Sequence, residues 1–269
     1  MGTSNSNPGQ KGKTPLVPSW LDDEPQTDQP KEDKPLPPLG DNERFKYPRG
    51  EFTRYINSSG RDSGHLRRAV SGYVRQSLGG ASNATQRLGA ARNSSTRLVS
   101  ILSGISANGL NNTLENHGFK DLIGKPIDQV FLGLVDYICP DGGRTDEGIA
   151  RSAFIELLPS LKEMGIDENA GINEAQFTVI IEIYFSNVIL QRMINDIGKN
   201  TIRLPSDINI IENIETQLNG FIQGTVSDAI VNLGVNIHEV SDENARQIVE
   251  DVYTTAYTVL ESLIEEAGE

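Results

Sequence analysis

The residues best suited to do chemistry stand at the start of the chain, in the run Met1-Gly2-Thr3-Ser4. A glycine at position 2 is small enough for the initiator methionine to be trimmed, which would expose the glycine α-amine. The pKa of such an amine is about 7.7–8.0, against ~10.4 for a lysine side chain, so part of it is neutral and nucleophilic at neutral pH. Glycine also lacks the Cβ that would crowd attack on an activated carboxylate. We therefore expect Gly2 to be the site of an acylation.

Two acylations fit these residues. The first is N-myristoylation, because Gly2 and Ser6 match the pattern M-G-x-x-x-S, a short motif that often arises by chance. The second is amide formation with a different acyl group, carried out by a dedicated partner enzyme. The sequence alone leaves both open.

The rest of the chain lacks the residue patterns of catalytic or metal sites. It has no G-x-x-x-x-G-K-[ST] loop for nucleotide phosphates, and its three histidines lack ligand spacing. Residues 141–147, DGGRTDE, lack the alternating Asp or Asn of a calcium loop, so we interpret them as a turn followed by a helix start. Cys139 is interpreted as a small buried residue rather than a nucleophile. We predict no catalytic residue, no metal and no cofactor bound by this chain, and therefore no enzyme.

The amino terminus is carried by a segment that is expected to remain unpacked. Residues 1–43 hold eight of the 13 prolines and few apolar side chains, too few to offset the entropy of ordering the segment. About 40 residues of coil extend ~35 Å, and more when stiffened by proline. We predict a flexible Pro-rich tail over 1–43. Its one apolar cluster, anchored by Trp20, is interpreted as a docking motif for this chain's own body or for a partner; its residues are Leu16, Val17, Pro18, Trp20 and Leu21.

A basic and aromatic segment follows, over 44–61, and is predicted to be a linker. By segment, residues 1–43 carry a net charge of −4, residues 44–97 carry +9 and residues 98–269 carry −18. Interleaved arginines and aromatic rings can clamp a phosphate and stack a base. A segment that lies across an acidic helical body would use the same residues, and we favour that interpretation. The candidate basic patch comprises Arg44, Lys46, Arg49, Arg54, Arg67, Arg68 and Arg75.

Residues 62–269 are predicted to form an all-α domain, a bundle of about seven helices. Apolar residues recur at three- and four-residue spacing, and helix-capping residues such as Asn173 with Gln176 mark helix starts. The expected helices span 64–78, 84–105, 110–116, 126–138, 145–164, 173–197, 206–233 and 241–267, and we see no run of alternating strand residues.

The sequence favours a soluble, cytoplasmic protein that does not associate with membranes. Its most apolar run, 177–190, is interrupted by Glu182 and is shorter than the roughly 20 residues that span a bilayer. The first dozen residues do not have the pattern of a signal peptide. A single cysteine, Cys139, rules out an internal disulfide and fits a reducing compartment.

The order of these features resembles the QatB family, the B component of bacterial Qat anti-phage defence systems. The resemblance is most specific over 1–23, in MGTSNS and TPLVPSWLDD, and is only architectural beyond them. It implies three partners: an ATPase (QatA), a QueC-like enzyme (QatC) and a TatD-like nuclease (QatD). It also implies that the QueC-like partner uses ATP to join a 7-deazaguanine carboxylate to Gly2, with Thr3 and Ser4 added to the docking residues.

Three hypotheses therefore enter the structural description. In the first, this chain is a modified substrate of the QueC-like enzyme, and its helical body is a scaffold. In the second, it is a nucleic-acid-binding adaptor that uses the basic Arg44–Arg97 region. In the third, it is a purely structural adaptor with an inert tail.

Overall fold

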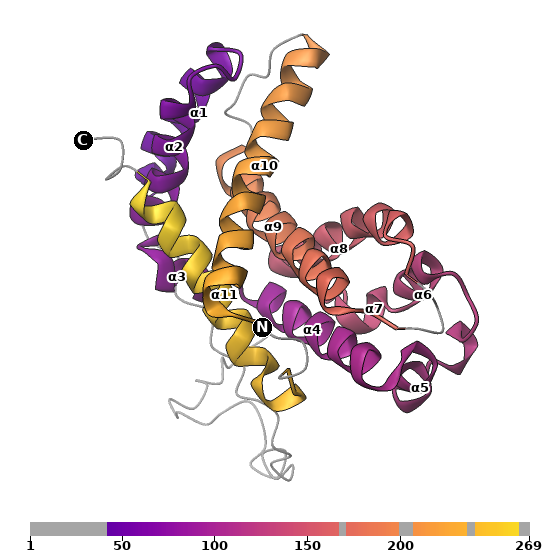
Figure 1. The fold of residues 1–269 in the computed structure, drawn as a ribbon. Helices are drawn as coiled ribbons and strands as arrows, with labels where there is room; N and C mark the ends of the chain where they lie inside the picture. The colour runs from indigo at the N-terminus through magenta and orange to yellow at the C-terminus, as the bar shows by residue number, and fades with distance from the viewer. Residues whose placement is uncertain (1–41, 167–170, 199–206, 236–239, 264–269) are drawn as a thin grey trace, which may run out of the picture. The chain divides into compact units, whose positions relative to one another are not determined.

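The computed structural model describes residues 42–166, 171–198, 207–235 and 240–263, in which helices are joined by short turns and connections (Figure 1). The prediction of an all-α domain is confirmed, because the described ranges contain eleven α-helices and no strand. Short segments join them: the 3₁₀ helices η2 (Asn42–Phe45) and η4 (Lys120–Leu122), and the π-helix η3 (Tyr73–Leu78). The α-helices are α1 (Lys46–Asn57), α2 (Ser63–Gly72), α3 (Ala81–Gln86), α4 (Ala90–Asn108), α5 (Leu110–Asn116), α6 (Ile127–Gly133), α7 (Val135–Ile138), α8 (Thr145–Glu163), α9 (Glu174–Gly198), α10 (Ile208–Leu233) and α11 (Asp242–Ser262).

Helix α9 lies at the centre of the core. It packs against α8 and α10, and also contacts α4 and α1. The predicted capping box starts it: the backbone N–H of Gln176 donates to Asn173 Oδ1 at 2.9 Å, and that of Asn173 donates to Gln176 Oε1 at 3.1 Å. Its buried side chains include Phe177, Tyr184 and Phe185. Each such burial contributes about 1.5–3 kcal/mol, so packing rather than intrinsic propensity holds this helix in place.

Helix α9 is also long and apolar enough, by length and composition, to cross a membrane. The apolar stretch continues beyond the 177–190 run to Gly198, so the helix has 25 residues and the length argument made from sequence was wrong. Sixty-one per cent of its most apolar window is buried inside the body, as expected of the core helix of a soluble protein.

The prediction that 44–61 is a linker was also wrong. Residues 46–57 form α1, which belongs to the compact unit of residues 35–269 and packs along α2. Pro48 lies in the first helical turn, where a backbone N–H has no partner within the helix, so proline is tolerated there. Tyr55 and Ile56 are buried against the rest of the body. Tertiary packing therefore makes helical a segment whose composition indicated a linker.

Several predicted helices are divided in the structure. The expected 64–78 helix consists of α2 and the π-helix η3, and the expected 126–138 helix consists of α6 and α7. The expected 84–105 helix breaks at Gly89, whose φ of +54° favours glycine. The break places the start of α4 against Asp146, which accepts the Ala90 N–H at 2.7 Å. A Cβ at Gly89 would clash with the same carboxylate.

We predict that Asp146→Ala lowers the free energy of unfolding by about 1–2 kcal/mol, because α4 loses an N-terminal hydrogen-bond acceptor. Urea unfolding, monitored by circular dichroism, measures this change in the free energy of unfolding. The control is Glu163→Ala, which removes an exposed carboxylate from the end of α8. Equal stability losses in the two variants would contradict the capping role of Asp146.

Candidate functional site

The residues predicted to carry the chemistry lie outside the described part of the chain. They are Gly2 and the docking residues Thr3, Ser4, Leu16, Val17, Pro18, Trp20 and Leu21. Acylation of Gly2 and docking through Trp20 therefore stay predictions. The structure bears instead on the candidate basic patch and on the polar groups of the helical body.

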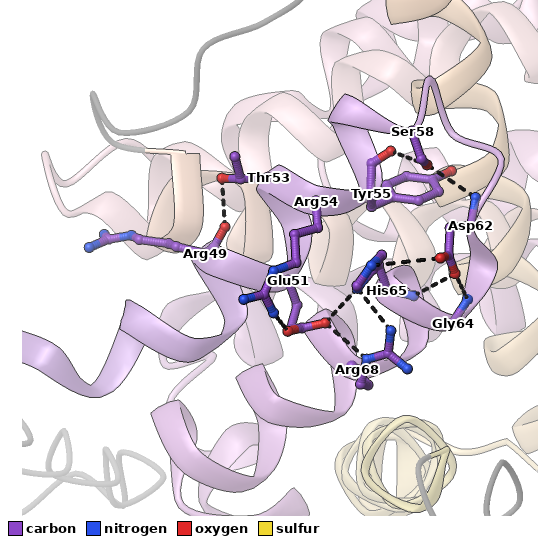
Figure 2. A network of polar contacts seen from close by, with 10 residues as sticks. All are labelled: Arg49, Glu51, Thr53, Arg54, Tyr55, Ser58, Asp62, Gly64, His65 and Arg68. Carbon is purple, nitrogen blue, oxygen red and sulfur yellow. Dashed lines mark hydrogen bonds and ion pairs between the residues drawn. The ribbon is translucent and has the colours of Figure 1, made fainter.

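Two arginines of the candidate basic patch bind one buried glutamate (Figure 2). Glu51 in α1 is 3% exposed. Its Oε1 accepts a hydrogen bond from Arg54, and its Oε2 accepts one from Arg68 Nε at 2.9 Å. His65 Nδ1 lies 2.7 Å from the same Oε2. Because His65 and Arg68 belong to α2, this network ties α1 to α2.

The network keeps Glu51 ionised. Burial alone would raise the pKa of its carboxyl, but the hydrogen bonds from His65 and Arg68, together with the charges of Arg54 and Arg68, hold that pKa below its ordinary value. The same interaction raises the pKa of Arg68. Arg54 and Arg68 thus pair with a buried acid of the basic segment itself, and not with the acidic residues of 98–269.

A second pair of patch residues lies at the carboxyl end of α9. Arg49 donates from Nη2 to the carbonyl of Asp196 at 2.9 Å and from Nε to the carbonyl of Ile197 at 3.0 Å. The guanidinium groups of Arg44 and Arg49 lie 4.7 Å and 5.2 Å from the centre of the Phe45 ring. The aromatic and basic residues of the segment therefore contact one another and α9.

The remaining patch residues are exposed. Lys46 is paired with Glu43 at 3.7 Å, and Arg67 and Arg75 lie on the surface of α2 and η3. The structure thus divides the patch between the Glu51 network, the end of α9 and the solvent. Of these residues, Arg49 is the one whose printed hydrogen bonds reach the acidic part of the chain, at backbone carbonyls of α9, whereas Arg54 and Arg68 pair with an acid of the basic segment itself.

The buried cysteine and the DGGRTDE turn have structural roles. Cys139 is fully buried near Tyr184, with its sulfur 3.6 Å from the Tyr184 hydroxyl, and burial raises the pKa of its thiol. Glu147 caps the start of α8 by accepting the backbone N–H of Arg144 at 2.9 Å. Among the described residues, no group of three or more His, Cys, Asp or Glu could hold a metal ion.

Sequence reasoning missed the acids around which the arginines gather. Glu51, Asp146 and Asp196 were not singled out, although Arg192 and Asp196 stand four residues apart and Glu51 and Arg54 stand three apart, spacings that place side chains together on a helix. Those spacings signal a local pair. The contacts of Glu51 with His65 and Arg68 depend on how two helices pack, which the spacing does not show.

We predict that Glu51→Gln lowers the free energy of unfolding at pH 7 by about 1–3 kcal/mol, because Arg54, His65 and Arg68 lose a charged acceptor. A carboxylate with a lowered pKa stabilises the fold above its unfolded pKa of about 4.3, and that contribution is lost as the pH falls through the folded value. The stability gap between wild type and variant should therefore narrow below about pH 4.

Urea unfolding at pH 7 and pH 3 measures this gap, with the exposed Glu215→Gln as the control. An unchanged gap at pH 3 would show that the charge of Glu51 does not stabilise the α1–α2 pair.

Comparison with family models identifies a family to which the chain is similar. The family model of the Qat anti-phage system associated protein QatB matches residues 79–260, from the end of η3 to the last turns of α11. The match covers the helical body from α3 onward, and it includes neither α1 and α2 nor residues 1–23, on which the resemblance seen in the sequence was most specific. No curated protein and no solved structure matches the chain. Since the matched residues make up more than half of the sequence, the chain belongs to the QatB family of Qat anti-phage systems.

Proposed function

We propose that this chain is a non-catalytic component of its defence system and that a QueC-like partner conjugates its N-terminal Gly2 to a 7-deazaguanine derivative. Membership of the QatB family makes the chain a component of an anti-phage Qat system, with other Qat components as its partners. The proposal adds that the QueC-like enzyme is the partner that acts, that it acts on the α-amine of Gly2, and that it uses ATP and a 7-deazaguanine substrate. It also places the reaction in the cytoplasm, where ATP is available.

One observation supports a scaffold role for the body. Its buried and half-buried carboxylates are used to hold helices: Glu51 joins α1 to α2, Asp146 caps α4, and Asp196 accepts hydrogen bonds from η3 and α9. Groups held in this way are poorly suited to exchange protons with a substrate. The reactive amine of Gly2 therefore remains the favoured chemical group of the chain.

The proposed reaction is an amide synthesis. The partner enzyme activates the carboxylate of the deazaguanine with ATP, which forms an acyl adenylate and releases pyrophosphate. After removal of Met1, the neutral α-amine of Gly2 attacks the acyl carbon, the C–N bond forms and AMP leaves with the bonding electron pair. The amine loses one proton to solvent. Thr3, Ser4 and the residues around Trp20 hold the amine in the partner's active site.

We predict that co-expression with the active QueC-like partner adds to the Gly2 peptide the mass of the deazaguanine acid less one water. Intact-mass and peptide mass spectrometry measure it. Gly2→Ala should lower the modified fraction about tenfold, because a Cβ displaces the amine in a closely fitted site. Gly9→Ala makes the same change elsewhere in the tail and should leave the modification intact. An unmodified Gly2 peptide in a preparation whose partner is active would exclude the proposal.

The nucleic-acid adaptor makes a different prediction. If the seven patch residues neutralised a phosphate backbone, the logarithm of the binding constant would fall with the logarithm of salt concentration with a slope of about six. Because Arg49, Arg54 and Arg68 hold internal groups, four of the seven residues remain to neutralise phosphates, and we expect a slope of about four or less for duplex DNA and for RNA. Fluorescence anisotropy measures the binding constant between about 50 and 200 mM salt, the range over which electrostatic binding to nucleic acid weakens strongly. The measured slope decides between the nucleic-acid adaptor and the internal role of the arginines.

A further inference from the structure

Helix α9 carries apolar side chains on the face opposite its buried one. Val179 and Ile194 are 40% and 45% exposed, and Ile183 and Leu190 are only partly buried. At about 100° per residue these four side chains lie within about 60° of one another around the helix axis, along ~22 Å of its length. They therefore form one surface. We call Val179, Ile183, Leu190 and Ile194 the α9 stripe.

Two neighbouring helices, α8 and α10, border the α9 stripe (Figure 1). On one side, Gln191 Nε2 donates to Glu156 Oε1 of α8 at 2.6 Å. On the other side, Gln223 Nε2 of α10 donates to Glu182 Oε1 at 2.9 Å. Gln191 and Glu182 project from α9 on opposite sides of the stripe. The α9 stripe is therefore the part of the central helix that α8 and α10 leave uncovered.

Both borders carry a carboxylate without a cationic partner. Glu156 and Glu182 each accept a hydrogen bond from a neutral amide, and neither forms an ion pair within the described ranges. Glu51, by contrast, is held by two arginines. Partial desolvation raises the pKa of Glu156, and a nearby cation would favour its ionised form. The borders of the stripe thus favour a positively charged occupant.

The surface on the α10 side leaves room for such an occupant. Gly220 stands three residues before Gln223, is exposed, and has nothing within 4 Å of the position that a Cβ would take. A glycine inside a helix costs about 1 kcal/mol relative to alanine, and no contact within the described body explains its place here. The backbone of α10 is therefore open to close approach beside the stripe.

The charges of the body select the kind of partner. A second copy of this chain would bring its own Glu156 and Glu182 to the same surface, where like charges repel. Residues 98–269 carry a net charge of −18, so the wider surroundings also favour a basic partner over a second copy.

We propose that the α9 stripe binds a basic amphipathic helix of another protein, with apolar side chains on the stripe and arginine or lysine at Glu156 and Glu182. The two borders are nine residues apart along α9, from Glu182 to Gln191, which is ~13 Å along the helix axis. Two residues nine apart on a partner helix cover the same distance and project on opposite sides, so they meet both acids. This surface lies within the helical body and does not depend on modification of Gly2.

The test is binding of two synthetic helical peptides of about 18 residues to the full-length chain, followed by fluorescence anisotropy at low salt. Both peptides carry leucines on one face; one has arginine at two edge positions nine apart, and the other has glutamate there. We expect the arginine peptide to bind at least about tenfold more tightly. No binding of the arginine peptide, or equal binding of the two, would overturn the proposal.

Variants of the chain locate the surface. Val179→Ser and Ile194→Ser should each weaken binding of the arginine peptide about fivefold, because apolar contact is lost. The control is Leu132→Ser, an exposed leucine of α6, which packs on α8. Equal affinity of the three variants and wild type would place the peptide elsewhere and contradict the proposal.

Charge variants separate the role of the acids from that of the stripe. Glu156→Gln and Glu182→Gln should each lower the preference for the arginine peptide about threefold, whereas Asp121→Asn, an exposed acid of η4, should leave it unchanged. The comparison of the two peptides on the wild-type chain holds even if a variant fails to fold. Sedimentation of the chain alone as a dimer that Ile194→Ser converts to a monomer would overturn the proposal, by assigning the stripe to a second copy.

Discussion

The fold depends on which donors form hydrogen bonds with the groups at the carboxyl end of its central helix, α9. Helix α9 is buried over much of its length, and the carbonyl groups of its last turn need donors from outside the helix. Arg49 in α1 donates to two of them, and Asp196 in the last turn is held by Tyr73 and Arg192. These contacts join η3 and α1 to the core formed by α8, α9 and α10.

Buried acids have a comparable role elsewhere in the body. Glu51 joins α1 to α2, and Asp146 holds the start of α4 beside α8. A body of many short helices has many helix ends, and each end leaves backbone groups that need partners. Charged side chains therefore appear where helices meet. This use of charge fits a component that presents surfaces to the other proteins of a Qat system, and it leaves the proposed covalent chemistry to the N-terminal amine.

Local patterns predicted much of the body and none of its long-range polar contacts. The capping box of Asn173 and Gln176 and the start of α8 near Thr145 were predictable, because the residues that cap a helix are its sequence neighbours. Helix α1 was missed because Pro48 and Gly50 argue against a helix, and only packing on α2 overrides them. The break at Gly89 was missed because apolar spacing continues across it. The Glu51 network joins two helices, and the contacts of Arg49 and Tyr73 with the end of α9 join residues far apart in the sequence, which periodicity does not detect.

The central claim is that the chain contributes its amino terminus to defence and uses its helical body as a scaffold. The most direct test is the plating efficiency of phage on cells that carry the complete Qat system with residues 2–10 of this chain deleted. The account predicts that defence is lost while the deleted protein accumulates to the wild-type level and keeps its helical circular dichroism. Undiminished defence with the deleted chain would contradict the account and would favour a structural adaptor with an inert tail.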